Sequence, residues 1–354
     1  MNKHLIALAV AAATLSGAAS AAQVYSDDSS SLAIGGRVEA RALLSEQADN
    51  KNVPAKLQTT DNEVTDISRV RVNIDAKTQI ADGVQGIGFF EREFKSNNGD
   101  DENRYMYAGV NSDQYGQIVY GKADGSLGML TDFTDIMAYA GSVVGVTKLA
   151  VADRTTNNLA YTGNFGDLTF KANYVFSGAD YDQNGNKTDV HGFSTAAKYN
   201  VADTGLALGL GYGEQRDQNG NPNTHKARSE QTFAVASYTM GDLYFGGLYK
   251  YGRRDVEGLT GSNKGKPVDS QGYEFAAAYT AGKAVFTTTY GFMKDEDAHN
   301  AYDELKNAAA VDATYYFNSN FRTYASYTFN MLDKNKVGKV AASDEFVLGA
   351  RYDF

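Results

Sequence analysis

Few side chains in this sequence could carry enzyme chemistry. The chain has no cysteine, which removes thiolate nucleophiles and thiolate metal sites, and it has only four histidines, one of which is His4 near the start. The other three, His191, His225 and His299, fall at or near different predicted loops, and no Gly-x-Ser-x-Gly sequence accompanies them. Catalysis by a Ser/His/acid or His/acid site would therefore require these histidines to meet at one rim of the molecule.

Two other patterns resemble ligand sites only in part. Residues 180–185 read D-x-D-x-N-G, the first half of a calcium loop, but the twelfth position is His191 instead of a bidentate glutamate. Gly209, Gly211 and Gly213 resemble a nucleotide fingerprint, yet they lie in an alternating segment that no helix follows. We interpret them as strand glycines. The sequence thus predicts neither a cofactor nor a metal site.

Charge and composition narrow the class of protein. The formal net charge is −10 and the pI is about 5.0, which argues against a nucleic-acid partner. A hydrophobic content of 42% and a mean hydropathy of −0.42 would suit an ordinary soluble protein. A transmembrane β-barrel has the same averages, because each strand presents only every second side chain to lipid. Interfacial aromatic girdles would be built from 24 Tyr and 18 Phe, since Trp is absent.

The first 21 residues have the three parts of a secretory signal peptide. A short basic start, residues 1–4, precedes an apolar run over residues 5–13, and Ala19-Ser20-Ala21 offers an Ala-x-Ala cleavage site. The apolar run is too short to cross a bilayer, which needs about 20 residues. The sequence predicts an exported chain, with a signal peptide over residues 1–21 and a single barrel domain over residues 22–354.

Period-2 alternation is the strongest structural signal. The last segment places apolar residues on one face and mostly polar or small residues on the other; the apolar face holds Phe346, Leu348, Ala350, Tyr352 and Phe354. The same split recurs over residues 69–76, 168–176 and 321–330. A soluble β-sandwich also alternates, but many of these segments reach the roughly 9–11 residues that a tilted strand needs to cross a membrane.

Connection lengths alternate between short and long, as they do in outer-membrane barrels. Short turns are predicted at 81–83, 112–114, 163–167, 240–242, 281–282 and 318–320. Long polar loops are predicted at 45–63, 96–103, 122–153, 178–188, 217–227, 255–269, 295–303 and 333–342. Eight long loops imply an all-β, antiparallel transmembrane barrel of sixteen strands, and a barrel of that size encloses an aqueous channel.

Several segments carry a family resemblance. Residues 32–39 resemble an opening strand, residues 104–110 and 115–122 resemble the strand pair before a third loop, and the terminal Arg351-Tyr352-Asp353-Phe354 resembles a barrel-assembly signal. The family is that of the general, non-specific outer-membrane porins of Gram-negative bacteria. The resemblance implies a homotrimer in the outer membrane, in contact with lipid and lipopolysaccharide and inserted by the barrel-assembly machinery. It also implies passive conduction of ions and small hydrophilic solutes, with no enzymatic activity.

In that family the third loop folds into the barrel and narrows the pore, with acidic residues facing a basic wall. The corresponding loop here spans about 122–153. The resemblance and the alternation together place a basic wall on the non-lipid face, at Arg37, Arg69, Arg71, Arg104 and Arg154. Asp135 matches one acidic loop position. The family's Pro-Glu-Phe-Gly turn is replaced by residues 138–141, so its glutamate falls on Tyr139, and the substitute is left open among Asp132, Asp124 and Glu39.

Opposed charges across a narrow waist would filter solutes by polarity and size. The arginines favour anions, whereas the acidic loops and the net charge favour cations; by resemblance we expect a preference for cations. A substrate-specific channel is the alternative, and it would show an aromatic track along the lumen. Small residues of the first strand, Gly35, Gly36, Ala40 and Ala42, could allow close subunit packing.

Overall fold

The computed structural model describes residues 22–49, 53–97, 99–178, 180–181, 187–221, 224–256, 267–296 and 302–354. The predicted signal peptide, most of the D-x-D-x-N-G segment and His299 lie outside the described residues. Among the residues described, no helix is long and apolar enough to span a membrane.

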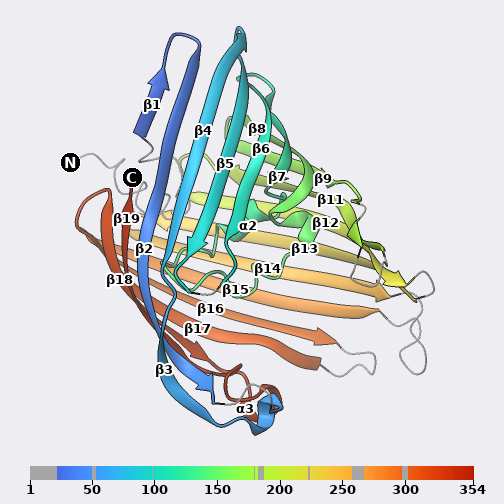
Figure 1. The fold of residues 1–354 in the computed structure, drawn as a ribbon, viewed down its shortest axis with the longest axis vertical. Coiled ribbons are helices and arrows are strands. Elements are labelled where there is room, and N and C mark those ends of the chain that lie inside the picture. Colours follow the sequence, from blue (N-terminus) through green and yellow to red (C-terminus); the bar gives the residue numbers. More distant parts are fainter. Residues whose placement is uncertain are drawn as a thin grey trace.

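Sixteen antiparallel strands form a closed barrel (Figure 1). The first eight are β2 (Ser30–Ala48), β4 (Arg69–Ala81), β5 (Val84–Lys95), β6 (Glu102–Ser112), β7 (Gly116–Ala123), β8 (Thr155–Phe165), β9 (Leu168–Val175) and β11 (Lys187–Asn200). The others are β12 (Leu206–Asn221), β13 (Thr224–Met240), β14 (Leu243–Val256), β15 (Val268–Ala281), β16 (Ala284–Glu296), β17 (Tyr302–Tyr316), β18 (Phe321–Asn330) and β19 (Glu345–Asp353).

Pairing of the last strand with the first closes the barrel. β19 pairs with β2 from Glu345 opposite Ser45 to Asp353 opposite Arg37. The short β1 (Ala22–Ser26) pairs with β2 just beyond that point and so continues the line of β19. β3 (Thr60–Asp66) pairs with the other end of β2 and leads into β4, while β10 (Asp180–Tyr181) pairs with the start of β11. Closure removes every open edge from the wall, as lipid requires.

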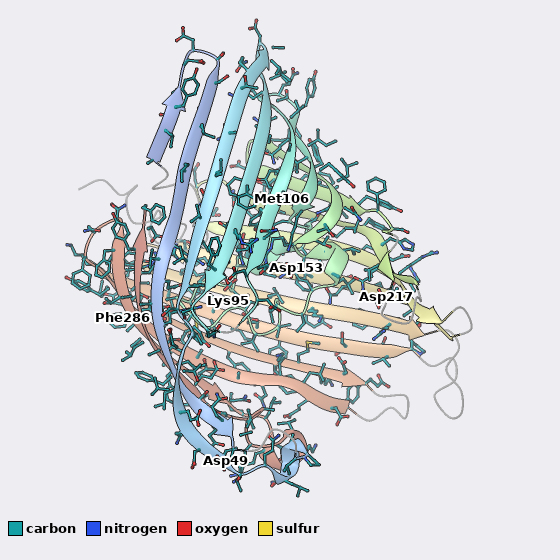
Figure 2. All side chains as sticks on the ribbon, viewed as in Figure 1. Asp49, Lys95, Met106, Asp153, Asp217 and Phe286 are labelled. Carbon is teal, nitrogen blue, oxygen red and sulfur yellow. The ribbon has the colours of Figure 1, made fainter. Side chains whose placement is uncertain are left out.

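The alternation predicted from the sequence is realised as two faces. On β16 the outward-facing Phe286 is 50% exposed, whereas its neighbours Val285 and Thr287 are buried on the inner face (Figure 2). Outward aromatic and aliphatic side chains recur on every part of the wall, including Leu210, Phe245, Phe275 and Leu348. This apolar exterior is the surface that a barrel presents to lipid.

The connections agree with the prediction in their order but not always in their length. Tight turns lie where they were predicted, for example at residues 82–83, 113–115, 166–167 and 241–242. The predicted loop over 217–227 is largely wrong, because β12 runs to Asn221 and β13 begins at Thr224. Polar side chains are compatible with a strand that is exposed to water, because backbone hydrogen bonds hold the neighbouring strands together. A turn over 201–205 was also missed.

Candidate pore constriction

Residues 124–154, between β7 and β8, form a loop that bonds to side chains on the inner face of the wall, and we name it the constriction loop after the role that the family resemblance predicts. Consecutive strands hold it with polar side chains. Ser126 bonds to Asn173 on β9 and Ser194 on β11, with its N–H donating to Asn173 Oδ1 at 3.0 Å and to Ser194 Oγ at 2.9 Å. On β13, Gln231 accepts from the Leu149 N–H at 3.0 Å and donates to the Thr147 carbonyl at 2.8 Å. These bonds attach the loop at several points along its length.

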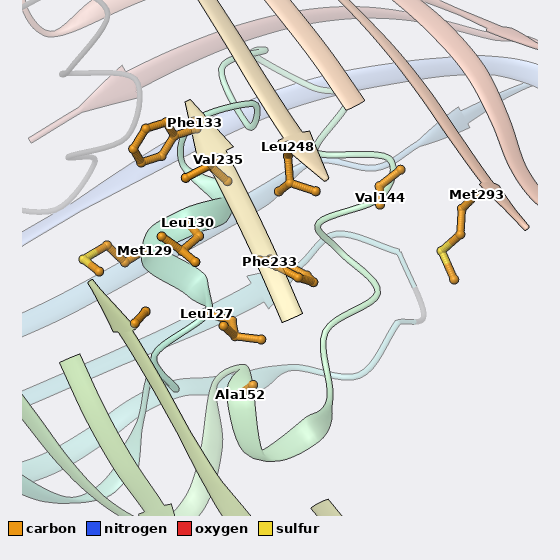
Figure 3. Packing of buried hydrophobic residues seen from close by; sticks show 11 residues of the cluster. Leu127, Met129, Leu130, Phe133, Val144, Ala152, Phe233, Val235, Leu248 and Met293 are labelled. Carbon is orange, nitrogen blue, oxygen red and sulfur yellow. The ribbon is translucent and has the colours of Figure 1, made fainter. Parts of the chain in front are cut away.

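A cluster of buried apolar side chains packs between the same loop and the wall. α2 (Gly128–Thr131) and the residue before it place Leu127 and Leu130, both fully buried, against Phe233 and Val235 of β13 (Figure 3). Strand glycines make room for them, since a Cβ on Gly211 would come within 2.6 Å of Leu127. The glycines of β12 thus serve close packing, which agrees with their interpretation as strand glycines.

Two buried ionisable side chains complete the attachment. Glu274 of β15, which is fully buried, accepts from the Val144 N–H at 2.6 Å and from the Ser142 hydroxyl at 2.8 Å. Lys250 of β14, 2% exposed, donates to the Thr147 hydroxyl at 2.5 Å and to its carbonyl at 3.0 Å. Sequence reasoning missed both residues. The only signal was a charged residue on the inner face of an otherwise apolar strand segment.

The predicted basic wall lies on the inner face, and its arginines have carboxylate partners on the wall itself. Arg69 contacts Glu39 at 2.7 Å and Glu93 at 3.3 Å, and Arg71 contacts Glu93 at 2.5 Å. Glu39 is 1% exposed and also accepts from the Tyr324 hydroxyl at 3.0 Å. Arg69 and Arg71 of β4 therefore each have a carboxylate neighbour on β2 or β5.

Arg37 is the exception in this part of the wall. It is 6% exposed, and the strand register places it between Arg71 on β4 and Asp353 on β19. Its Nε has no hydrogen-bond partner among the described residues.

Arg104 reaches the lumen through a β-bulge. The expectation that alternation places Arg104 on the non-lipid face is wrong, because alternation from the outward Met106 and Val110 places Arg104 outward as well. Instead, Tyr105 pairs with Glu91 and Asn103 pairs with Arg92, which leaves Arg104 as an extra residue in β6. Its Nε donates to Glu91 at 2.6 Å.

Arg154, at the end of the constriction loop, belongs to the same group of ion pairs. It contacts Glu102 at 2.9 Å, and Lys122 contacts the same carboxylate at 3.4 Å. The glutamates at positions 91, 93 and 102 were absent from the predicted site. They lie directly opposite or beside the arginines, and only the register could identify them.

The acidic candidates occupy three different settings. Asp132 and Asp135 are exposed on the loop, and the charges that act on Asp132 include Lys171 and Lys198 of β9 and β11. The pKa of Asp132 is raised because the surrounding protein limits its solvation, with added repulsion from neighbouring carboxylates. Asp124 accepts a hydrogen bond from the Tyr105 hydroxyl at 2.9 Å. Glu39 belongs to the wall and not to the loop.

Tyr139 stands where the family resemblance placed a glutamate. Its ring lies 5.7 Å from the guanidinium of Arg41, and its hydroxyl donates to Glu345 on β19 at 3.2 Å. The tip of the loop therefore meets the wall through an aromatic contact and a hydrogen bond to a carboxylate. No carboxylate of the loop is needed at this contact, because Glu345 is supplied by the wall.

The C-terminal residues predicted as an assembly signal complete the barrel. Tyr352 is 49% exposed on the outer face and stacks on Phe354, with ring centroids 6.5 Å apart. Of the three histidines considered for catalysis, only His191 has a described side chain, on β11. No group of three or more His, Asp or Glu side chains that could hold a metal occurs among the described residues.

A closed barrel with an apolar exterior, a charged interior and an internal loop is the architecture of an outer-membrane channel. Comparisons with known proteins agree. A family model for Gram-negative porins matches residues 7–335, and the chain is 56% identical to the porin-like protein L of Photobacterium profundum over the whole of both chains. The chain belongs to the Gram-negative porin family and is a protein of the outer membrane.

Solved structures show the same fold. The chain resembles OmpF of Salmonella typhi, solved in complex with daunomycin, with a TM-score of 0.74 and 20% identity over 94% of this chain and all of that one. It also resembles OmpT of Vibrio cholerae in its trimer form, with a TM-score of 0.69 and 20% identity over 92% of this chain and all of that one.

Proposed function

We propose that the protein is a passive, non-catalytic diffusion channel whose selectivity is set where the constriction loop faces the charged wall. The observation that supports this most is the attachment of the loop to one side of the barrel, through Ser126, Thr147 and Val144. A loop held in this way narrows the lumen without needing a bound ligand. Small hydrophilic solutes and ions would pass between the loop and the arginine-bearing strands.

The predicted basic and acidic residues keep their proposed roles in this scheme. Arg37, Arg69, Arg71, Arg104 and Arg154 supply positive charge on the wall. Asp124, Asp132 and Asp135 supply negative charge on the loop. Because Arg69, Arg71 and Arg104 are paired with glutamates of the same wall, we propose that the exposed loop aspartates add negative charge that a permeating ion meets. We therefore propose a preference for cations.

Single-channel recording in planar bilayers, with a salt gradient, tests this function. The purified mature protein should give large steady current steps and a reversal potential on the cation side. Asp135→Lys should move the reversal potential toward anions. A folded barrel that conducts no current would overturn the proposal of a diffusion channel, and an unmoved reversal potential would remove Asp135 from the ion path.

A homotrimer is the proposed assembly. A hollow on the outer face of β2, β17, β18 and β19 has larger side chains such as Tyr315 and Leu348 in its lining and is otherwise rich in alanine, with Ala40, Ala42, Ala313, Ala325 and Ala350. A second barrel can approach closely there, unlike on the aromatic parts of the wall. Gly35, one of the small residues expected to help, is buried and pairs in register with the inward Asn73, so it does not belong to this face.

The trimer is tested by sedimentation of the protein in detergent. Ala325→Trp should shift the protein toward monomers, whereas Thr288→Trp on the outer face of β16 should leave the oligomer unchanged. Equal oligomeric states in the two variants would contradict this placement of the interface. Contact with lipopolysaccharide and recognition of the Tyr352/Phe354 signal by the barrel-assembly machinery remain predictions of the family resemblance.

A further inference from the structure

A cluster of aromatic side chains lines the lumen on β5 and β6. The ring centroid of Phe89 lies 5.6 Å from that of Tyr107 and 5.8 Å from that of Tyr105, and the two tyrosine rings are 6.3 Å apart. Phe89 lies two residues before Glu91, whose carboxylate contacts Arg104, so the cluster shares the inner face with the basic wall. We name Phe89, Tyr105 and Tyr107 the luminal aromatic cluster.

The position of this cluster differs from that of the other apolar side chains inside the barrel. Phe233, Leu248 and their neighbours are buried beneath the constriction loop. The three rings of the luminal aromatic cluster are only partly buried, and Tyr107 packs against the buried side chains of Val119 and Ala160. An aromatic surface that is supported on one side and partly open to lumen water is available to a permeating solute.

The bulge in β6 builds the polar surroundings of the cluster. Because Arg104 is the extra residue, both Arg104 and Tyr105 face the lumen. The guanidinium carbons of Arg104 and Arg154 lie 5.9 and 5.3 Å from the centre of the Tyr105 ring. The Tyr105 hydroxyl is held by Asp124 at 2.9 Å, which fixes the ring in place.

The charges around the cluster balance. Three cations, Arg104, Lys122 and Arg154, lie among three carboxylates, Glu91, Glu102 and Asp124. A guanidinium has five N–H donors and a carboxylate about four acceptor sites, more than the ion pairs occupy. The surroundings therefore offer donors and acceptors together, with no net charge to attract an ion of either sign.

We propose that the luminal aromatic cluster is a binding subsite for uncharged ring-shaped solutes that carry hydroxyl groups, such as a pyranose sugar. Because the guanidiniums of Arg104 and Arg154 already lie over Tyr105, the positive C–H edges of the solute ring would lie on the negative faces of Phe89 and Tyr107. Its hydroxyls would bond to the surrounding arginines and carboxylates. This inference rests on the proposed channel function and adds to it a chemical class of solute that is retained in passing.

The test compares glucose with sorbitol, which has the same carbon chain but no ring. Both should lower the single-channel conductance through viscosity, and glucose should add a saturable reduction. Tyr107→Ala and Phe89→Ala should weaken that saturable part by about two- to tenfold, the range expected for loss of one aromatic contact. Tyr107→Phe keeps the ring and should keep the effect.

Met106→Ala is the matched control, because Met106 lies between the two tyrosines but is 50% exposed on the outer face. It should bind glucose as the unchanged protein does. Equal responses to glucose and sorbitol, or an unchanged response in Tyr107→Ala, would overturn the subsite while leaving the channel function intact. If the protein without substitutions conducts no current, the channel function itself is rejected.

Discussion

Gly36 and Phe354 exchange two backbone hydrogen bonds, the Gly36 N–H donating to Phe354 at 2.9 Å and the Phe354 N–H donating to the Gly36 carbonyl at 3.0 Å. The last residue of the chain is thereby joined to the first strand of the wall. Ala22 then pairs with Ile34 two residues earlier on β2, so that β1 continues the line of β19. Barrel closure thus depends on a residue at the very end of the chain.

Substitution of Gly36 should weaken this closure. A Cβ at Gly36 would overlap the Arg71 carbonyl oxygen and come within 2.9 Å of the Phe354 ring. Gly36→Val should therefore lower the free energy of unfolding by about 1–3 kcal/mol, as overpacking does elsewhere. Heat-dependent mobility on gels and urea unfolding in detergent would measure it. Gly88→Val is the control, since a Cβ at Gly88 meets open space; equal losses in both variants would contradict the argument.

Removal of the Glu274 carboxylate should release part of the constriction loop. Glu274→Ala leaves the buried Val144 N–H without its acceptor, which costs about 1–3 kcal/mol. We expect larger and noisier single-channel currents, because the segment over 142–145 loses its attachment to β15. Glu214→Ala, on the outer face of β12, should leave the current noise unchanged. Quiet, unchanged currents in Glu274→Ala would show that the remaining bonds hold the loop.

Features with a local sequence signal could be predicted, whereas features that depend on strand register or tertiary packing could not. Alternation and turn residues are local, and they correctly predicted a sixteen-stranded barrel from segments such as 346–354 and 321–330. The partners of the basic wall depend on register, which pairs Arg71 with Glu93 across β4 and β5. The bulge at Arg104 and the buried Glu274 are likewise products of tertiary packing. Family resemblance placed an acid at Tyr139, whereas here the carboxylate at that contact is Glu345 of the wall.

Because Arg71 and Glu93 form an ion pair within the wall, we expect the second substitution of the pair to reverse the effect of the first on the reversal potential. Glu93→Gln leaves Arg69 and Arg71 without a shared carboxylate, so the reversal potential should move toward anions. The double variant Arg71→Gln/Glu93→Gln removes one charge of each sign and should return close to the original value. Reversal potentials recorded under one and the same salt gradient would measure both. A double variant that stays as anion-selective as Glu93→Gln would contradict the assignment of these residues to one charge-balanced pair.

The selectivity should also depend on pH through Asp132. Its pKa is raised above the ordinary range of an aspartate, so the carboxylate loses its charge at a higher pH than an isolated one would. Protonation removes a negative charge from the lumen, and the preference for cations should fall as the pH falls through that raised pKa. The Asp132→Asn variant has no carboxylate to protonate at this position, so its reversal potential should vary less over the same pH range. Above that range the variant should be less selective for cations than the original protein. Parallel pH profiles for the two proteins would show that Asp132 is not the group that titrates, and Asp135, whose pKa is raised by the same limited solvation, would be the next residue to replace.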